Sequence, residues 1–268
     1  MSAKGESLGT VQRVVEILRH MAERGETTIK DLSAALGLVP STCHRMLDLL
    51  AREGLVERNA ARRSYRVGPE YFRLSALVQT HLDVRSLARP FLQQVVDACD
   101  ETCVLSLYQP AEGHMVFAEK CDSSQLLRYQ LALNTPLPVA WGASGRSILA
   151  FLPEEERKRL FEVTGVAPAS GQKVPSFAAL EAELAEVRRQ GYALTHGQKI
   201  AGAVGISAPV FGASGAVIGS LGVTVPEQRI GEADEAKLAA LVRRHAEALS
   251  RALGAPDPLS LPNQARSA

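Results

Sequence analysis

A pair of short apolar segments, joined by a glycine turn, constrains this chain more than any other stretch. The first segment begins at Thr28, which can cap a helix together with Asp31 three residues on. Its apolar residues recur at helical spacing up to Gly37, where glycine permits a left-handed stop. The second segment starts near Pro40 and stops at Gly54. Two short helices in this arrangement form a helix-turn-helix, so the sequence predicts a DNA-binding unit.

The second of these helices has two different faces. Its apolar residues recur at helical spacing and are expected to face the core: Cys43, Met46, Leu49 and Leu50. The opposite face is polar, and its N-terminal end carries donors that can reach base edges and phosphates in a major groove. The candidate DNA-reading residues are Ser41, Thr42, His44 and Arg45.

The flanking segments complete a winged version of this motif. Upstream, a helical stripe predicts a first helix and consists of Val11, Val14, Val15, Leu18, Met21 and Ala22. Downstream, residues 55–58 and 64–67 have the pattern of two short strands. Arg62 and Arg63 lie between these strands, so we expect them at the tip of a wing beside DNA. An ordinary helical hairpin with a solvated charged face is the alternative, and apolar periodicity alone does not exclude it.

Length and composition leave room for a second, larger domain. The chain has 268 residues, of which 46% are hydrophobic, so it can hold a small DNA-binding unit over 1–68 and a domain with its own core. No apolar run approaches the ~20 residues that span a bilayer, and the N-terminus lacks the apolar core of a signal peptide. We therefore expect a cytoplasmic protein without a membrane partner. The net charge of +1, with a modest basic excess in the first third, supports nucleic-acid binding only weakly.

The remainder of the chain mixes strands and helices. A helical pattern over 69–83 predicts a linker helix, and a second domain is expected over 84–253. Strands are expected at 102–108, 114–121, 126–133, 192–195, 203–211 and 216–225, and helices at 84–98, 144–152, 153–163, 177–190 and 232–253. Short meandering strands with helices on one side predict an α+β sensor domain around an antiparallel sheet. The tail, 254–268, is rich in Pro and Ser and is expected to be disordered.

Residues with reactive side chains are few and poorly arranged for catalysis. Cys43, Cys99, Cys103 and Cys121 include no Cys-x-x-Cys pair, and no histidine lies at zinc-finger spacing from them, so neither a metal nor a cofactor is expected. We interpret them as buried free thiols, with a redox pair of Cys99 and Cys103 as the alternative. The motif Gly142-Ala-Ser-Gly-Arg-Ser147 has Arg146 where a nucleophile elbow needs glycine. No catalytic residue is assigned, and an enzyme is the least favoured class.

Three blocks of sequence, the first of which includes the helix-turn-helix, allow a comparison with a known family. They are Val11-Gln-Arg-Val-Val-Glu-Ile-Leu with the helix-turn-helix, residues 136–150, and residues 188–194 followed by 206–211 and 221–224. On these blocks the chain resembles the IclR family of bacterial transcription regulators. The resemblance implies a winged helix-turn-helix, a linker helix and a C-terminal effector-binding domain related to GAF-type sensors. It also implies a homodimer or dimer of dimers on double-stranded operator DNA, with Val11 to Ala22 and the linker helix as contacts.

The same resemblance implies a site for a small-molecule effector. The turn Ala143-Ser144-Gly145 opens a helix, whose free amides and dipole would suit a carboxylate. Glycines at other family pocket positions, and Ala140 where a histidine is frequent, imply a roomy cavity. Trp141 could stack on an aromatic ligand, or instead fill the core. The candidate effector-binding residues are Trp141, Ala143, Ser144, Gly145, Thr195, His196, Gly205, Gly222 and Thr224.

These expectations describe a regulator that senses a small organic acid, with an aromatic acid as one option, and that controls catabolic genes. A constitutive DNA-binding protein without an effector is the alternative, although it would not need the large second domain.

Overall fold

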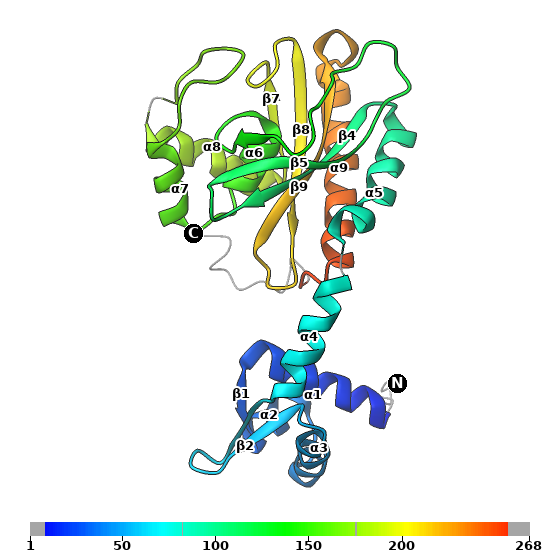
Figure 1. Cartoon of the computed structure of the whole chain (residues 1–268), viewed down its shortest axis with the longest axis vertical. Coiled ribbons are helices and arrows are strands. Elements are labelled where there is room, and N and C mark those ends of the chain that lie inside the picture. Colours follow the sequence, from blue (N-terminus) through cyan, green and yellow to red (C-terminus); the bar gives the residue numbers. More distant parts are fainter. Residues whose placement is uncertain (1–8, 82, 175, 257–268) are drawn as a thin grey trace, which may run out of the picture. The chain divides into compact units, whose positions relative to one another are not determined.

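The chain forms two compact units, Met1–Leu82 and Asp83–Ala268 (Figure 1). The computed structural model describes residues 9–81, 83–174 and 176–256. Most of the tail that was expected to be disordered, 257–268, lies outside the described residues.

The first unit is a winged helix-turn-helix, as predicted, followed by a further helix. Its elements are α1 (Thr10–Arg24), β1 (Glu26–Thr28), α2 (Ile29–Leu36), α3 (Pro40–Arg52), β2 (Val56–Asn59), β3 (Ser64–Val67) and α4 (Pro69–His81). The three strands form an antiparallel sheet in the order β1-β3-β2. The sequence pattern did not predict β1, because a strand of three residues is too short to show an alternating pattern.

Local capping explains where the helix-turn-helix begins and turns. The amide of Asp31 donates to Thr28 Oγ1 at 3.2 Å, and the Thr28 hydroxyl donates to Asp31 Oδ2 at 2.8 Å. Gly37 ends α2 in the left-handed conformation at φ 62°. The buried core of this unit consists of Ile17, Met21, Leu32, Cys43, Met46, Leu47, Leu50, Val56 and Tyr65.

Two predicted apolar stripes are shifted in the structure. In α3, Leu49 is 54% exposed, whereas Leu47, which was not in the predicted stripe, is fully buried, so the prediction that Leu49 faces the core was wrong. In α1, Val11 is 79% exposed, whereas Ile17 is fully buried. The cause is the same in both helices: the core accepts only a narrow stripe, and its exact direction depends on the neighbouring helices rather than on apolar spacing alone.

The second unit is built around one antiparallel sheet. Its elements are α5 (Val84–Cys99), β4 (Thr102–Gln109), β5 (His114–Cys121), β6 (Pro136–Pro138), α6 (Gly142–Leu149), α7 (Glu154–Glu162), α8 (Phe177–Gln190), β7 (Ala193–His196), β8 (Ala203–Phe211), β9 (Val217–Pro226), a 3-10 turn η1 (Glu227–Arg229) and α9 (Glu232–Ala252). The six strands lie in the order β6-β5-β4-β9-β8-β7. Every neighbouring pair is antiparallel, as expected.

Helices cover both faces of this sheet, which corrects the expectation of helices on one side. Helices α5 and α9 pack on one face, and α6, α7 and α8 lie on the other (Figure 1). The inner strands β8 and β9 are consequently buried along almost their whole length. Strands that are buried on both faces are rich in apolar residues, and β8 has Ala203, Val204, Ile206, Ala208 and Val210 buried along its length.

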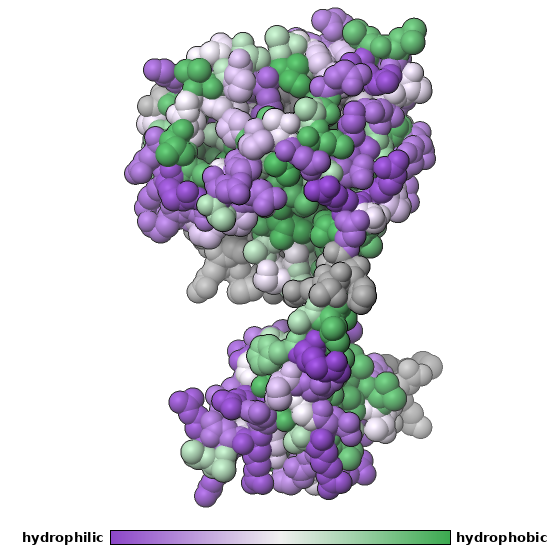
Figure 2. Space-filling model, in the orientation of Figure 1, coloured by the Kyte–Doolittle hydropathy of each residue, from purple (hydrophilic) through white to green (hydrophobic). Residues whose placement is uncertain are grey.

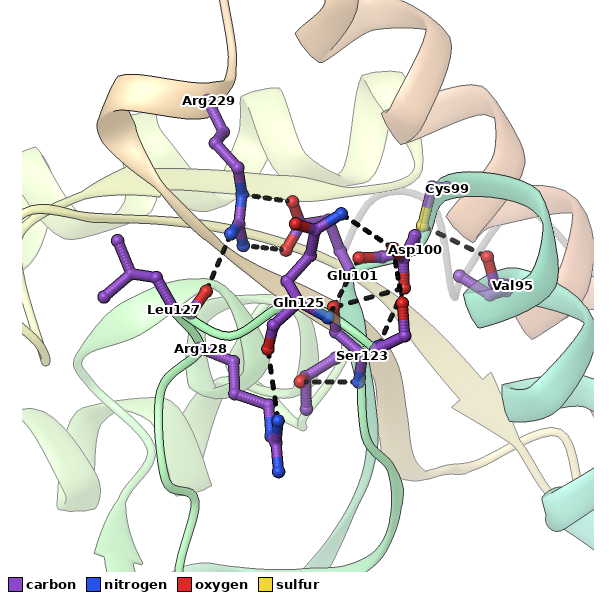
Figure 3. A network of polar contacts seen from close by, with 11 residues as sticks. Val95, Cys99, Asp100, Glu101, Ser123, Gln125, Leu127, Arg128 and Arg229 are labelled. Carbon is purple, nitrogen blue, oxygen red and sulfur yellow. Dashed lines mark hydrogen bonds and ion pairs between the residues drawn. The ribbon is translucent and has the colours of Figure 1, made fainter.

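The strand predicted at 126–133 does not form. The segment between β5 and β6 is instead fixed by polar contacts around Asp100 (Figure 3), whose carboxylate accepts from the amide of Ser124 at 2.8 Å and from Gln125 Nε2 at 2.7 Å. Arg229 bonds both carboxylate oxygens of Glu101, at 2.9 and 2.7 Å, and donates to the carbonyl of Leu127 at 2.7 Å. These side-chain bonds take the place of strand pairing, and the prediction failed because local apolar spacing does not report them.

Candidate nucleic-acid interface and ligand cavity

The outer face of α3 is the first candidate site. Six side chains line a shallow depression there: Ser41, His44, Arg45, Asp48, Leu49 and Arg52. Pro40 begins the helix, where its missing N–H costs no hydrogen bond. Of the predicted DNA-reading residues, Ser41, His44 and Arg45 are exposed, whereas Thr42 is half-buried. The geometry therefore offers a short row of donors at the start of one helix.

A chain of two contacts, from His44 to Asp48 and from Asp48 to Tyr65, orients His44 on this face. Its Nδ1 lies 2.9 Å from Asp48 Oδ2, one helical turn further on. The hydroxyl of Tyr65, a buried residue of β3, donates to the other oxygen of Asp48 at 3.4 Å. Burial raises the pKa of the Tyr65 hydroxyl, and the Asp48 charge raises it further, so Tyr65 stays a donor. The wing thus helps to orient a side chain on the outer face of α3.

The two arginines of the wing are both exposed, but they are not equivalent. Arg62 Nη1 lies 3.5 Å from Glu26 Oε2. The same carboxylate accepts hydrogen bonds from Ser64 and Asn59, and the bond from Ser64 contributes most to lowering the Glu26 pKa. Arg63 has a φ of 51° in the turn, and no ion pair of its side chain occurs within the described part of the wing. Arg63 therefore presents the less neutralised positive charge.

A cavity in the second unit is the other candidate site. The space inside it that a small molecule can occupy is about 40 Å³, so it is a small hollow. It is lined by Phe117, Gly142, Ala143, Ser144, Thr195, Gln198, Lys199, Ile200, Ala203, Gly205, Val223 and Thr224. Five residues predicted from the sequence meet here: Ala143, Ser144, Thr195, Gly205 and Thr224. They come from α6, β7, β8 and β9, so the sheet and α6 together shape the cavity.

Trp141 lies outside this lining. It is 3% exposed and packs in a small cluster with Ala140 and Ala167. The guanidinium of Arg146 lies 5.5 Å from the centroid of its ring. The aromatic side chain that does line the cavity is Phe117 of β5. Trp141 therefore occupies the position of a core residue, and the argument for an aromatic ligand no longer has Trp141 as a support.

Three other predicted residues also lie outside the lining. A Cβ at Gly145 would stand 2.2 Å from the carbonyl oxygen of Val139, and one at Gly222 would stand 2.6 Å from Ser207 Oγ. These two glycines permit close backbone packing rather than enlarging the cavity. The side chain of His196 is 50% exposed and lies 3.6 Å from Glu235 Oε1.

The first residues of α6 line the cavity, and the first amide of this helix makes a hydrogen bond to a side chain. Gly142 adopts a φ of +75° and donates its N–H to Gln198 Oε1 at 3.1 Å. The preceding residue, Trp141, supplies no side-chain cap. A side-chain oxygen from the segment between β7 and β8 therefore stands where the positive end of the helix dipole would favour an anion.

Lys199 is a cavity residue that the sequence did not reveal. Its ammonium nitrogen is buried and has no hydrogen-bond acceptor among the described residues. It lies 5.8 Å from the centroid of the Phe117 ring. Burial lowers the pKa of Lys199 to about 7. A lysine in a glycine-flanked turn normally points into water, so no local pattern could have predicted this burial.

The cysteines form no further site. All four cysteines are free, and burial raises the pKa of Cys99 and places that of Cys103 well above its usual range. Such thiols resist ionisation, which does not favour the redox alternative. Within the described ranges, no group of three His, Cys, Asp or Glu side chains could hold a metal, and no helix is long and apolar enough to cross a membrane.

A winged helix-turn-helix in one unit, joined to a sheet domain with a small cavity in the other, is the architecture of two-domain transcriptional regulators. Residues 10–60 match the IclR helix-turn-helix domain, and residues 76–251 match the bacterial transcriptional regulator IclR C-terminal domain. The chain belongs to the IclR family of transcriptional regulators, and it is therefore not an enzyme.

Individual relatives agree with this assignment. The HTH-type transcriptional regulator XynR of Escherichia coli is 29% identical over 92% of this chain and 98% of its own length. The solved structure of an IclR transcriptional regulator from Silicibacter is 28% identical, with a TM-score of 0.78 over 95% of this chain and 99% of that one. The Agobacterium tumefaciens repressor BlcR is 27% identical, with a TM-score of 0.65 over 92% of this chain and 98% of that one.

Proposed function

We propose that this regulator is ligand-responsive: an organic acid binds in the cavity and changes the affinity of the protein for its operator. The observation that carries the proposal is the cavity itself, which lies at the start of α6 in an otherwise closely packed domain. A negative ligand is favoured there by the dipole of α6, by the Gly142 amide and by the buried ammonium of Lys199. A ligand that prefers one arrangement of the two units would shift the equilibrium toward it.

The DNA-reading residues in this proposal are Ser41, Thr42, His44 and Arg45 on α3, with Arg62 and Arg63 on the wing. A donor row at a helix start suits base edges, whereas arginines on a turn suit phosphates or a minor groove. The alternative of a constitutive DNA-binding protein makes a different prediction, because it expects no small molecule to alter operator affinity.

The effector in this proposal is a small carboxylic acid held by Ala143, Ser144 and the facing residues Thr195, Gly205 and Thr224. Serine and threonine hydroxyls can accept or donate, so they fit a carboxylate or a carbonyl. Phe117, Ile200 and Val223 supply apolar walls for the rest of the molecule. Glyoxylate, pyruvate and benzoate therefore form a graded test of ligand size.

Operator binding measured by fluorescence anisotropy, with and without each acid, tests the proposal. We expect at least one acid to shift the affinity and Ser144→Asp to abolish the shift, because a second negative charge would face the carboxylate. Ser214→Asp is the matched control, since Ser214 lies exposed on the turn between β8 and β9. An operator affinity that no acid changes would support the constitutive alternative.

We also propose that the protein works as a homodimer or a dimer of dimers. Apolar side chains gather on α4 and near α1 (Figure 2), among them Phe72 at 66%, Val78 at 67% and Val11 at 79% exposure. Exposed apolar surface of this kind is typical of subunit contacts. Phe72→Glu should then lower the oligomeric state in light scattering, and a wild-type monomer both free and on DNA would contradict the proposal.

The family resemblance further suggests that the protein acts in the cytoplasm on genes for the catabolism of the acid that it senses. Mapping its binding sites on the genome, followed by transcript measurements with and without the acid, tests this suggestion.

A further inference from the structure

We propose that Lys199 selects the effector by charge: its ammonium pairs with the carboxylate, while the Gly142 amide, which donates to Gln198 Oε1 in this structure, becomes the second donor. This inference rests on the proposed function, because it names the residues by which that cavity would recognise an acid.

The first argument is the missing counter-charge. Two arginines that are buried among the described residues of the second unit each have a carboxylate close by: Arg157 Nε lies 2.7 Å from Glu181 Oε1, and Arg146 Nη1 lies 3.0 Å from Glu183 Oε2. Lys199 departs from this pattern, since its buried ammonium has neither an ion pair nor a hydrogen bond within the described residues. A buried charge without a partner is unfavourable, so a site that keeps one is suited to a ligand that brings the opposite charge.

The second argument is the placement of Lys199 at the helix start. A Cβ at Gly142 would lie 3.3 Å from Lys199 Cβ and 3.5 Å from its Cε, so the lysine stem runs directly over the first residue of α6. The neighbouring Gln198 accepts the Gly142 N–H. Gly142 and Lys199 both line the one cavity, so an amide and an ammonium are available to the two oxygens of one carboxylate.

The third argument concerns the segment that carries both side chains. Residues 197–202 are tied down at both ends, because the Gly197 amide donates to the Ala203 carbonyl at 2.9 Å and the Tyr129 hydroxyl donates to the Ala201 carbonyl at 3.2 Å. Gln198 itself is fixed through its carbonyl, which accepts from the Ala169 amide at 3.1 Å. The backbone is held while the Gln198 amide group remains replaceable, as an exchange with a ligand oxygen requires.

The rest of the cavity wall limits the ligand to a single negative charge. The lining contains hydroxyls and apolar groups, and no aspartate or glutamate competes for Lys199. A second carboxylate on the ligand would meet no further cation in the lining. Monocarboxylates are therefore the preferred class over dicarboxylates and over neutral amides of the same shape.

Calorimetric titration of the full chain with matched acid and amide pairs tests the assignment. Pyruvate is compared with pyruvamide, and benzoate with benzamide, because each pair differs in charge but hardly in shape. We expect the wild type to prefer the acid by about tenfold or more, as for a charge-assisted pair. Lys199→Met should reduce this preference to about one while amide binding persists, and Lys199→Arg should restore part of it. Lys173→Met, at an exposed lysine outside the lining, is the control.

Gln198→Ala tests the exchange at the Gly142 amide separately. Removing the side chain leaves that amide open, so we expect acids to bind more tightly than to the wild type. Equal or weaker binding would contradict the exchange.

The outcomes separate this inference from the proposed function. A Lys199→Met protein that keeps the preference for acids overturns the role of Lys199 but leaves the cavity as the effector site. A wild-type protein that binds none of the acids contradicts the proposed function and, with it, this assignment. Retained amide binding and an unchanged circular dichroism spectrum show that the variant is folded.

Discussion

Replacing Lys199 by methionine should stabilise the protein without ligand, and the gain should depend on pH. Burial lowers the pKa of Lys199 from 10.5 to about 7, so the folded state releases a proton more readily than the unfolded state does. Because the unfolded state binds more protons between these two values, wild-type stability is lowest below about pH 7 and rises toward pH 10.5. One pKa unit corresponds to about 1.36 kcal/mol, so the wild type should gain roughly 2 kcal/mol between about pH 7 and pH 9.

Urea unfolding of the wild type and Lys199→Met at both pH values measures this effect. Trp141 is the only tryptophan and lies in the second unit, so its fluorescence reports on the unit that contains Lys199. The buried cysteines and tyrosines titrate in both proteins, and their contribution cancels in the difference. We expect Lys199→Met to be the more stable protein near neutral pH, with an advantage that shrinks by roughly 2 kcal/mol at the higher pH. An advantage that does not change with pH would show that the ammonium is solvated, and would refute the reasoning.

Three further predictions follow from the described contacts. Arg45→Ala should cost about 1–3 kcal/mol of operator binding while sparing unrelated DNA, and an unchanged operator affinity would argue against base contact. Arg63→Ala should lower the slope of log binding affinity against log salt concentration by about one. Arg62→Ala should lower this slope by less, because Glu26 already neutralises part of the Arg62 charge. Equal slopes for the two variants would contradict this difference. Arg157→Ala should destabilise the second unit by about 1–3 kcal/mol in urea unfolding, since Glu181 loses one of its two arginine partners and keeps Arg188. A loss below about 0.5 kcal/mol would mean that the pair is solvated.

The parts of the site that lie within one element could be predicted from the sequence. The cap at Thr28, the stop at Gly37 and the exposed start of α3 all depend on residues three or four positions apart. The helix α8 and the strands β8 and β9 were also predicted to within one residue, because their apolar residues follow one another within a single element. The resemblance to a family added five of the cavity residues, among them Ala143 and Ser144.

The tertiary structure decided everything that depends on contacts between distant segments. Gly142 meets Gln198 across 56 positions of sequence, and Lys199 is buried only because its turn folds over the start of α6. The sequence around Lys199 has the composition of an exposed turn. Its ammonium becomes a candidate ligand contact only because the fold packs this turn against the start of α6. Trp141 shows the converse: adjacent in sequence to the cavity residues, it points into a separate buried cluster. Local hydrogen bonds and apolar spacing determine the elements, whereas burial and the lack of a counter-charge are properties of the packed fold.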